Sequence, residues 1–253
     1  MALICLDLDG TVLHEGKPVK GVIESIELLK KNNHEIAIAT GRSPLLLNNY
    51  DSLLGVDYLV LANGGHVQVK GNIIFERYIP SEYVKRAMEY SDSENIDLVI
   101  EYDDKYVAYR KDTDIPDKFC DIFKIDKPDI DRNYYPNRNV FSMIVFDSDK
   151  IDDMRKKLPE LQFNSSNKFG YDVNLKGDLK ADGIRALVDH LGYEMNDVFA
   201  IGDGYNDISM IKAVGHGIAM GNASQELKDK AEYITTDVNN YGLMNALKYY
   251  SLI

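Results

Sequence analysis

The chain has 253 residues, of which 45% are hydrophobic, with a formal net charge of -12 at pH 7 and an isoelectric point near 4.9. This length suffices for one large or two modest domains with a sizeable core. The acidic balance argues against nucleic acid and anionic membranes as partners, because affinity for them depends largely on Lys and Arg. An acidic protein can still bind a small phosphate through a metal ion and a few local cations.

The cysteines and the start of the chain bear on the cellular compartment. There are two cysteines, Cys5 and Cys120, so no disulfide framework is indicated and both are expected to be reduced. The apolar run of residues 2–6 precedes a candidate catalytic Asp7, which leaves no room for a cleavable signal peptide. No apolar run is long enough to span a bilayer. The sequence therefore predicts a cytoplasmic protein.

The first third of the chain alternates strand and helix patterns. The expected elements are a strand over residues 2–6, a helix over 22–31, a strand over 36–39, a helix that begins after Ser43 and ends before Gly55, and a strand over 58–61. Ser43 followed by Pro44 is typical of an N-cap with proline at the first helical position. The same alternation resumes at residues 184–191, 198–201, 207–213 and 217–220. A βαβαβ series of this kind predicts an α/β, doubly wound parallel sheet of the Rossmann-like type.

The interval between these segments has a different, α+β pattern. The expected elements are a hairpin of residues 97–102 and 106–109, a strand over 141–146, a helix near 150–157 and strands near 161–164 and 170–175, with a long excursion over 111–139. Its many tyrosines, among them Tyr102 and Tyr109, are expected in strands and core rather than in a substrate pocket. The sequence predicts a core of residues 1–79 and 174–253 and an inserted domain of residues 80–173.

Four short polar segments stand next to predicted elements of the core. They are Asp7-Leu8-Asp9-Gly10-Thr11-Val12, Thr40-Gly41-Arg42, Lys180 and Gly202-Asp203-Gly204-Tyr205-Asn206-Asp207. The first and last follow continuous apolar runs, as expected for strands buried on both faces. Ligands of open α/β sheets bind beyond the carboxyl ends of such strands. The four segments can therefore converge on one edge of one sheet, and their composition indicates a phosphoryl-transfer site.

Asp7 and Asp9 have the spacing of a catalytic pair. Residues i and i+2 at a strand end project to the same side, so the two carboxylates can act as nucleophile and acid/base on one substrate. A calcium loop is the main alternative. An EF-hand loop that starts at Asp7 would need glycine at its sixth position and glutamate at its twelfth, where this chain has Val12 and Pro18. The catalytic interpretation is therefore favoured.

The second and third segments are weaker signals by themselves. Thr40-Gly41-Arg42 offers a hydroxyl and backbone N–H groups to phosphate oxygens, although Thr-Gly is also a common exit from a strand. A lone lysine such as Lys180, placed before a helix expected near Ile184, is more often a solvated surface residue.

The last segment contains hard oxygen ligands. Asp203, Asn206 and Asp207 form a carboxylate-amide-carboxylate cluster of the kind that Mg²⁺ prefers. An Asx-type turn that caps the following helix is the alternative, and it can hold for Asp207 without excluding a metal at Asp203. The chain has no P-loop, no His-Glu-x-x-His and no Gly-x-Ser-x-Gly motif.

Together these segments resemble motifs I to IV of the haloacid dehalogenase (HAD) superfamily, and in particular its Cof-type phosphatase branch, which has a C2B cap between motifs II and III. Further segments resemble that branch: Ala62-Asn63-Gly64-Gly65, residues 217–223 and Asn239-Asn240-Tyr241-Gly242. The resemblance covers the whole core, and the cap by position and general composition. Register selects Lys180 over Lys176 as the family lysine, with Ala181 where the branch commonly has glycine.

The resemblance implies a Mg²⁺-dependent phosphatase that forms an aspartyl-phosphate. Asp7 would attack phosphorus, and Asp9 would protonate the leaving oxygen and then activate water. The implied site comprises Mg²⁺ held by Asp7, the Asp9 carbonyl and Asp203; phosphate contacts from Thr40, Gly41, Lys180, Asn206 and the backbone at Leu8; Arg42, Asn63 and Gly64 near the substrate; and Asp207 behind these groups. The cap would close over a small phosphorylated metabolite.

Two other functions remain open at this point. A sugar phosphomutase of related fold would return the phosphate to its substrate, and product analysis would distinguish it. A non-catalytic sensor of phosphorylated ligands is the other, although a pure binder has no need of the acid/base carboxylate Asp9. The expected partner is a small phosphorylated metabolite, most plausibly a sugar phosphate or a phosphorylated cofactor, and the protein is expected to be a monomer or a homodimer.

Overall fold

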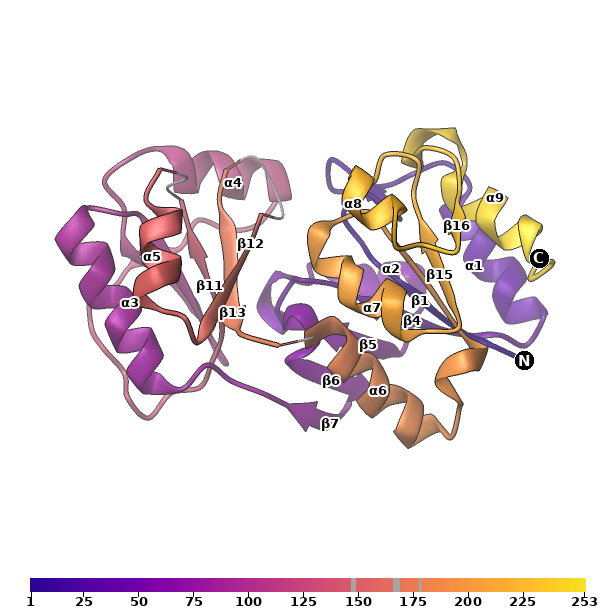
Figure 1. Cartoon of the computed structure of the whole chain (residues 1–253), viewed down its shortest axis with the longest axis horizontal. Helices are drawn as coiled ribbons and strands as arrows, with labels where there is room; N and C mark the ends of the chain where they lie inside the picture. Colours follow the sequence, from indigo (N-terminus) through magenta and orange to yellow (C-terminus); the bar gives the residue numbers. More distant parts are fainter. Residues whose placement is uncertain (147–148, 166–168, 178) are drawn as a thin grey trace. The chain divides into compact units, whose positions relative to one another are not determined.

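The computed structural model describes residues 1–146, 149–165, 169–177 and 179–253. The chain folds into two compact units (Figure 1). The first unit comprises Met1–Gly41, Asn49–Glu76 and Asp178–Ile253, and the second comprises Arg42–Asn48 and Arg77–Gly177. The segment Arg42–Asn48 thus groups with the inserted residues, whereas the division expected from the sequence assigns it to the core.

The first unit is built on an eight-stranded sheet. Its strands lie in the order β16 (Tyr233–Ile234), β15 (His216–Ala219), β14 (Val198–Gly202), β1 (Leu3–Leu6), β4 (Glu35–Ala39), β5 (Tyr58–Leu61), β6 (His66–Val69) and β7 (Asn72–Glu76). The first six are parallel to one another, whereas β6 and β7 add an antiparallel edge. The doubly wound parallel sheet predicted from the apolar runs is confirmed, and the antiparallel edge of β6 and β7 was not predicted.

Helices cover both faces of this sheet, which explains why its central strands are apolar throughout. Helices α6 (Leu179–Leu191) and α7 (Ile208–Ala213) pack on the face that bears Leu3 and Cys5. Helices α1 (Val22–Lys31) and α9 (Gly242–Tyr249) contact each other on the opposite face, where α1 lies against β4 (Figure 1). The short helix α8 (Gln225–Lys228) and the small hairpin of β2 (Leu13–His14) and β3 (Lys17–Pro18) complete the unit.

The single helix expected between Ser43 and Gly55 is wrong. Pro44–Leu46 forms one 3-10 turn, and helix α2 spans only Tyr50–Leu54. Asn48 and Asn49 interrupt the helix with φ values of 55° and 57°, a left-handed conformation that asparagine tolerates better than most residues. The side chain of Ser43 makes no capping hydrogen bond.

The second unit contains a six-stranded sheet. Its strands lie in the order β10 (Asp129–Ile130), β9 (Tyr106–Arg110), β8 (Leu98–Tyr102), β11 (Val140–Val145), β13 (Tyr171–Leu175) and β12 (Leu161–Ser165). All neighbours are antiparallel except β9 and β10. The predicted hairpin of β8 and β9 is confirmed. The stretch 111–139, expected as an excursion, contains α4 (Ile115–Phe123) and β10.

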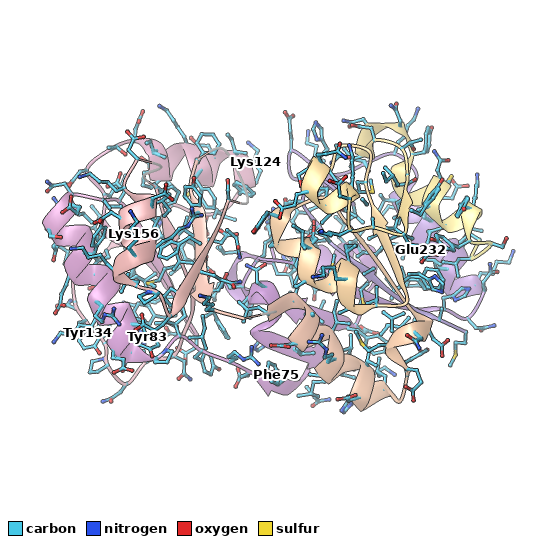
Figure 2. All side chains as sticks on the ribbon, in the orientation of Figure 1. Phe75, Tyr83, Lys124, Tyr134, Lys156 and Glu232 are labelled. Atoms are coloured by element: carbon cyan, nitrogen blue, oxygen red, sulfur yellow. The ribbon has the colours of Figure 1, made fainter. Side chains whose placement is uncertain are left out.

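Two helices cover one face of this second sheet. Side chains of α3 (Ser81–Glu94) and α5 (Ile151–Lys157) form an apolar core with alternate residues of the strands. Tyr102 and Tyr109 lie in that core, as predicted, and Tyr83 and Tyr134 pack partly buried against it (Figure 2). On the opposite face, α4 packs on Val99 and Ala108.

Candidate active site

The predicted polar segments of the first unit lie at the carboxyl ends of neighbouring strands. Asp7 follows β1 and Asp203 follows β14, two strands that pair directly through Leu6 and Ile201. Thr40 follows β4, and its carbonyl oxygen accepts a hydrogen bond of 3.0 Å from the backbone N–H of Asn63, just beyond β5. Because the strands are parallel, residues from the two ends of the chain lie close together beyond the carboxyl ends of the central strands.

Lys180 lies in the first turn of α6, which begins at Leu179 rather than near Ile184. Its side chain is fully buried, so the surface interpretation of this lysine is wrong. The ammonium group donates a hydrogen bond of 2.8 Å to Asp7 Oδ1 and another to Asp207 Oδ1. Burial opposes the charged form, but the carboxylates of Asp207 and Asp7 raise the pKa of Lys180. Lys180 is therefore a fixed cation beside Asp7.

Gly64 allows the loop after β5 to approach the start of α6. A Cβ atom at Gly64 would lie 1.9 Å from the carbonyl oxygen of Leu179, and its φ of +91° favours glycine independently. A side chain at this position would push the first turn of α6 away. The glycine expected near the substrate thus contributes to the placement of Lys180.

Asp207 holds the loop that carries Asp203. Its Oδ2 accepts hydrogen bonds from the backbone N–H groups of Asp203, at 2.9 Å, and Gly204, at 2.8 Å. This is the Asx-type arrangement considered for Asp207 in the sequence analysis. Because its Oδ1 accepts from Lys180, both oxygens of Asp207 already have protein partners.

Asp203 is oriented by residues from two other loops. Thr11 Oγ1 lies 3.5 Å from Asp203 Oδ1, and Asn222 Nδ2 donates to Oδ2 at 3.1 Å. Asn222 also donates to the Gly10 carbonyl at 2.9 Å, and its own Oδ1 accepts from the backbone of Val238. Asn222 is not among the site residues predicted from the sequence. It lies within residues 217–223, which resemble the Cof-type branch, and its local signal is a polar side chain shortly beyond an apolar strand.

Gly10 packs directly against the carboxylate of Asp203. A Cβ atom on Gly10 would lie 2.2 Å from Asp203 Oδ2, and the φ of Gly10 is +88°. Both the space and the backbone conformation therefore require glycine. The Asp-x-Asp-Gly segment and the Gly-Asp segment interlock through this contact.

The remaining predicted site residues differ in their burial and in their hydrogen-bond partners. Asn206 Nδ2 donates to Asn63 Oδ1 at 2.8 Å, which joins the loops after β14 and β5. Leu8 and Thr40 are buried, whereas Asp9 and Gly41 are partly exposed. Arg42 groups with the second unit, where its guanidinium donates to the Leu46 carbonyl at 3.0 Å and lies 5.6 Å from the ring centre of Phe123.

The carboxylates of the site crowd one another. One oxygen each of Asp7, Asp203 and Asp207 lies within 4.8 Å of the others. Burial, and then the charge of Asp207, raises the pKa of Asp203 to about 7 and the pKa of Asp7 well above its usual value. Lys180 supplies one positive charge against three carboxylates. The donor set therefore fits a divalent cation with a preference for oxygen, and Asp7 and Asp203 have the oxygens to bind it.

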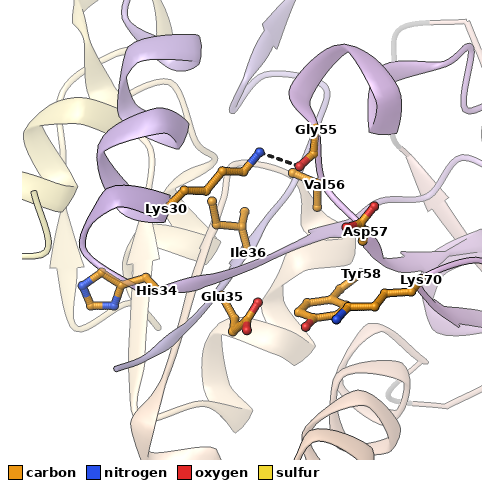
Figure 3. A pocket seen from close by; sticks show the side chains of 9 residues that line it. All are labelled: Lys30, His34, Glu35, Ile36, Gly55, Val56, Asp57, Tyr58 and Lys70. Carbon is orange, nitrogen blue, oxygen red and sulfur yellow. Dashed lines mark hydrogen bonds between the residues drawn. The ribbon is translucent and has the colours of Figure 1, made fainter.

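A cavity of about 190 Å³ lies at the opposite ends of the strands (Figure 3). It is lined by the start of β4, at Glu35, and the start of β5, at Tyr58. The Nζ of Lys30 is held there by the Gly55 carbonyl at 2.5 Å, and His34 Nδ1 accepts from the backbone of Ala2 at 3.1 Å. These polar groups thus serve the packing of helix ends and loops.

Comparisons with known proteins agree on one family. The sequence profile described as haloacid dehalogenase-like hydrolase matches residues 4–247. The putative phosphatase YkrA of Bacillus subtilis (strain 168) is 29% identical over 99% of this chain and 98% of its own length. The 5-amino-6-(5-phospho-D-ribitylamino)uracil phosphatase YcsE of the same strain is 26% identical, covering 99% and 96%. The solved structure of the HAD subclass IIB sugar phosphatase BT4131 has a TM-score of 0.92 at 25% identity and covers 100% of both chains.

Proposed function

Because the chain belongs to the haloacid dehalogenase-like hydrolase family, we propose that it is a Mg²⁺-dependent phosphatase of small phosphomonoesters, such as sugar phosphates or phosphorylated cofactors. Its relatives bear the names of phosphatases. The observation that carries the proposal is the buried Asp7 carboxylate, which is held by Lys180 and lies within 4.8 Å of Asp203 and Asp207. That arrangement provides a positioned nucleophile beside an oxygen-rich cation site.

In the proposed reaction, Asp7 is the nucleophile. An oxygen of its carboxylate forms a bond to phosphorus while the bond from phosphorus to the leaving oxygen breaks, which yields an aspartyl-phosphate. Asp9 gives a proton to the leaving oxygen. In the second half, Asp9 takes a proton from a water molecule that attacks phosphorus, and Asp7 is released with inorganic phosphate. Because the reaction is divided into two displacements at phosphorus, Asp7 and Asp9 take part both in forming the aspartyl-phosphate and in hydrolysing it.

Other residues of the site would position the phosphoryl group. Lys180 orients the Asp7 oxygen and offsets part of the negative charge that accumulates during transfer. We assign the phosphate contacts to Thr40, Asn206 and the backbone N–H groups at Leu8 and Gly41. The hydrogen bond between Asn206 and Asn63 holds the amide of Asn206 in one orientation, with Gly64 adjacent. Arg42 stays a predicted neighbour of the substrate.

The proposed cation site uses Asp7, Asp203 and the backbone carbonyl of Asp9. Asp207 fits a supporting position, because both of its oxygens bond to protein groups. A bound Mg²⁺ would neutralise charge on the transferring phosphoryl oxygens. Thr11, Asn222 and Gly10 keep the carboxylate of Asp203 in place for it.

We propose that residues 80–173 act as a C2B cap on a catalytic core of residues 1–79 and 174–253. Core residues bind the phosphate, so discrimination among leaving groups would come from cap side chains. Small metabolites would then be better substrates than polymers or phosphoproteins.

We also propose a cytoplasmic location. Cys5 and Cys120 are both free, buried thiols, as expected for a protein of a reducing compartment. Across the described residues, every helix is too short or too polar to cross a membrane.

Phosphate release from 4-nitrophenyl phosphate tests the proposed function. We expect turnover that disappears when the protein is treated with chelator and returns with added Mg²⁺. Full turnover after exhaustive chelation would refute the metal assignment. A product that keeps the phosphate on the sugar, with no inorganic phosphate released, would indicate a mutase instead.

A further inference from the structure

Three consecutive residues after β5 have a left-handed backbone. Ala62, Asn63 and Gly64 have φ values of 50°, 52° and 91°. Glycine adopts such values freely and asparagine tolerates them, whereas alanine is disfavoured because its Cβ comes too close to the following carbonyl oxygen. Residues in this conformation persist where the surrounding structure fixes them, and they are frequent at functional sites. We call residues 62–64 the left-handed turn.

Neighbouring backbone fixes the left-handed turn in place. The N–H of Asn63 donates to the carbonyl oxygen of Thr40 at 3.0 Å. Helix α6 packs against the turn so closely that a Cβ atom on Gly183 would lie 2.7 Å from the Cα of Gly64. All three residues of the turn are buried. These contacts hold the side chain of Asn63 in a set position.

From this position, Asn63 bonds to a loop on the other side of the central strands. The strand order β14-β1-β4-β5 places two strands between the loop of Asn63 and the loop of Asn206. At about 4.8 Å per strand, β5 and β14 are roughly 14 Å apart. Nevertheless, Asn206 Nδ2 donates to Asn63 Oδ1 at 2.8 Å. The bond therefore spans the carboxyl ends of β1 and β4, where Asp7 and Thr40 follow.

This bond determines how the amide of Asn206 is oriented. Its Oδ1 lies near Gly204, where a Cβ atom on Gly204 would approach it to 2.5 Å. Its Nδ2 has two hydrogens, and one of them is donated to Asn63. An N–H group is the part of an amide that suits a phosphate oxygen, whereas the amide oxygen would repel it. The orientation is thus the one that a phosphate ligand needs.

We propose that Asn63 is a positioning residue, which the left-handed turn holds so that Asn206 directs its second N–H group at the phosphate. Asn63 then acts on the phosphate through Asn206 and does not touch the substrate itself. Because the amide is oriented before the substrate arrives, binding does not have to order it. This inference rests on the proposed phosphatase function and deepens one of its assigned phosphate contacts.

The first test replaces Asn63 by glycine, which removes the acceptor and suits the φ of 52°. We expect KM for 4-nitrophenyl phosphate to rise at least about fivefold, because a donor to a charged group is no longer held in place. The dissociation constant of inorganic phosphate, measured by titration calorimetry with Mg²⁺ present, should rise by the same factor. The kcat should change by less than about twofold, since the contact serves the bound substrate and the transition state alike.

Asn33→Gly is the matched control. Asn33 also has a left-handed φ, of 60°, but it is exposed and lies between α1 and β4, at the opposite end of the sheet from Asp7. Both variants place glycine at a left-handed asparagine, so they share the change in backbone freedom. Phosphate affinity and KM should stay at wild-type values in Asn33→Gly. An equal rise in both variants would contradict the role of the Asn63 side chain.

A double-mutant cycle distinguishes positioning from direct contact. Asn206→Ala should weaken phosphate binding by itself. Adding Asn63→Gly to it should then change the dissociation constant by less than about twofold, because the group that Asn63 positions is already gone. Two independent contacts, or a purely structural role of Asn63, would give effects that multiply, and this result would overturn the inference. Unchanged phosphate affinity in a folded Asn63→Gly protein would overturn it as well.

A measurement on the wild type keeps the test decisive if Asn63→Gly does not fold. In an NMR spectrum of protein with isotope-labelled asparagine, the two side-chain amide protons of Asn206 are identified by their loss in Asn206→Ala. Inorganic phosphate with Mg²⁺ should shift one of them downfield and leave the other, which Asn63 holds, nearly in place. Equal shifts of both protons, or no shift of either at saturating phosphate, would contradict the proposed orientation.

Failure of this inference can be told apart from failure of the proposed function. If the wild type neither hydrolyses 4-nitrophenyl phosphate nor binds inorganic phosphate, the proposed function fails and this inference falls with it. If the wild type does both while the effects of Asn63→Gly and Asn206→Ala multiply, only this inference fails.

Discussion

Lys180 donates a hydrogen bond of 2.8 Å to Asp7 Oδ1, although 173 positions separate the two residues in the sequence. The same ammonium group contacts Asp207, whose other oxygen holds the loop of Asp203. One buried cation therefore links the proposed nucleophile to the loop that carries the proposed metal ligand. Changes at Lys180 should affect both stability and activity.

The first prediction concerns this cation. Lys180→Met should destabilise the protein by about 3 to 5 kcal/mol, because it leaves two buried carboxylates without their counter-ion. Urea unfolding would measure the loss. Arg185→Met on the same helix is the control: Arg185 forms an exposed pair with Asp182, so its removal should cost about 0.5 kcal/mol or less. Equal losses in the two variants would contradict the role of Lys180.

The second prediction separates the roles of Asp7 and Asp9. Asp7→Asn should abolish turnover, because the amide cannot act as the nucleophile. Asp9→Asn should slow the reaction, and the loss should be smaller for 4-nitrophenyl phosphate than for a sugar phosphate, since a good leaving group needs less protonation. Steady-state rates on both substrates measure the difference. Wild-type rates in the Asp7→Asn protein would rule out covalent catalysis at Asp7.

The third prediction concerns the contact of Gly10 with Asp203. Gly10→Ala should displace the Asp203 carboxylate, because the new Cβ would lie 2.2 Å from Oδ2. The Mg²⁺ concentration needed for half-maximal activity should rise at least about tenfold, as for other losses of a supported ligand position. Gly71→Ala is a close control, because Gly71 has a similar φ of +79° and nothing within 4 Å of a Cβ atom. If both variants show the same Mg²⁺ response, backbone strain alone is responsible.

The fourth prediction uses the pKa of Glu101, which burial raises to about 7 compared with 4.5 for an ordinary glutamate. Below pH 4.5 the residue is protonated in the folded and unfolded states and has no effect on stability. Between pH 4.5 and 7 only the unfolded state ionises, so the wild type loses stability as pH rises. Above pH 7 the free energy of unfolding of the wild type has fallen by the full amount, on the order of 3 kcal/mol, and no longer changes through this residue.

Glu101→Gln lacks this titration and provides the reference. Its free energy of unfolding minus that of the wild type should grow from pH 5 to pH 7 and then stay level, as measured by urea unfolding at each pH. Asp172 and Tyr106 are the titratable neighbours of Glu101, and both are present in the two proteins. A difference that is constant from pH 5 to pH 8 would contradict the buried, ionisable state of Glu101.

Local patterns sufficed for much of the fold. Continuous apolar runs predicted β1 and β14 as buried parallel strands, and turns such as residues 103–105 predicted the hairpin of β8 and β9. These predictions are confirmed because a strand that is covered on both faces has a continuous apolar run, whereas a strand that is covered on one face has alternating apolar residues. The prediction of one helix after Ser43 was wrong. A Ser-Pro start indicates where a helix begins, but it does not show that Asn48 and Asn49 interrupt the helix a few residues later.

The sequence by itself determined the α/β class, the order of the central elements and the polar segments that follow the strands. Only the tertiary structure decided that Lys180 is buried against Asp7, that Asn222 orients Asp203 and that Glu101 is buried. The periodicity of apolar residues does not reveal whether a single polar residue is buried. Its burial depends on the groups that surround it in the fold, which can be far away in the sequence. For Lys180 those groups are carboxylates that offset the cost of burial, whereas for Glu101 the hydroxyls of Ser43 and Ser142 offset only part of that cost.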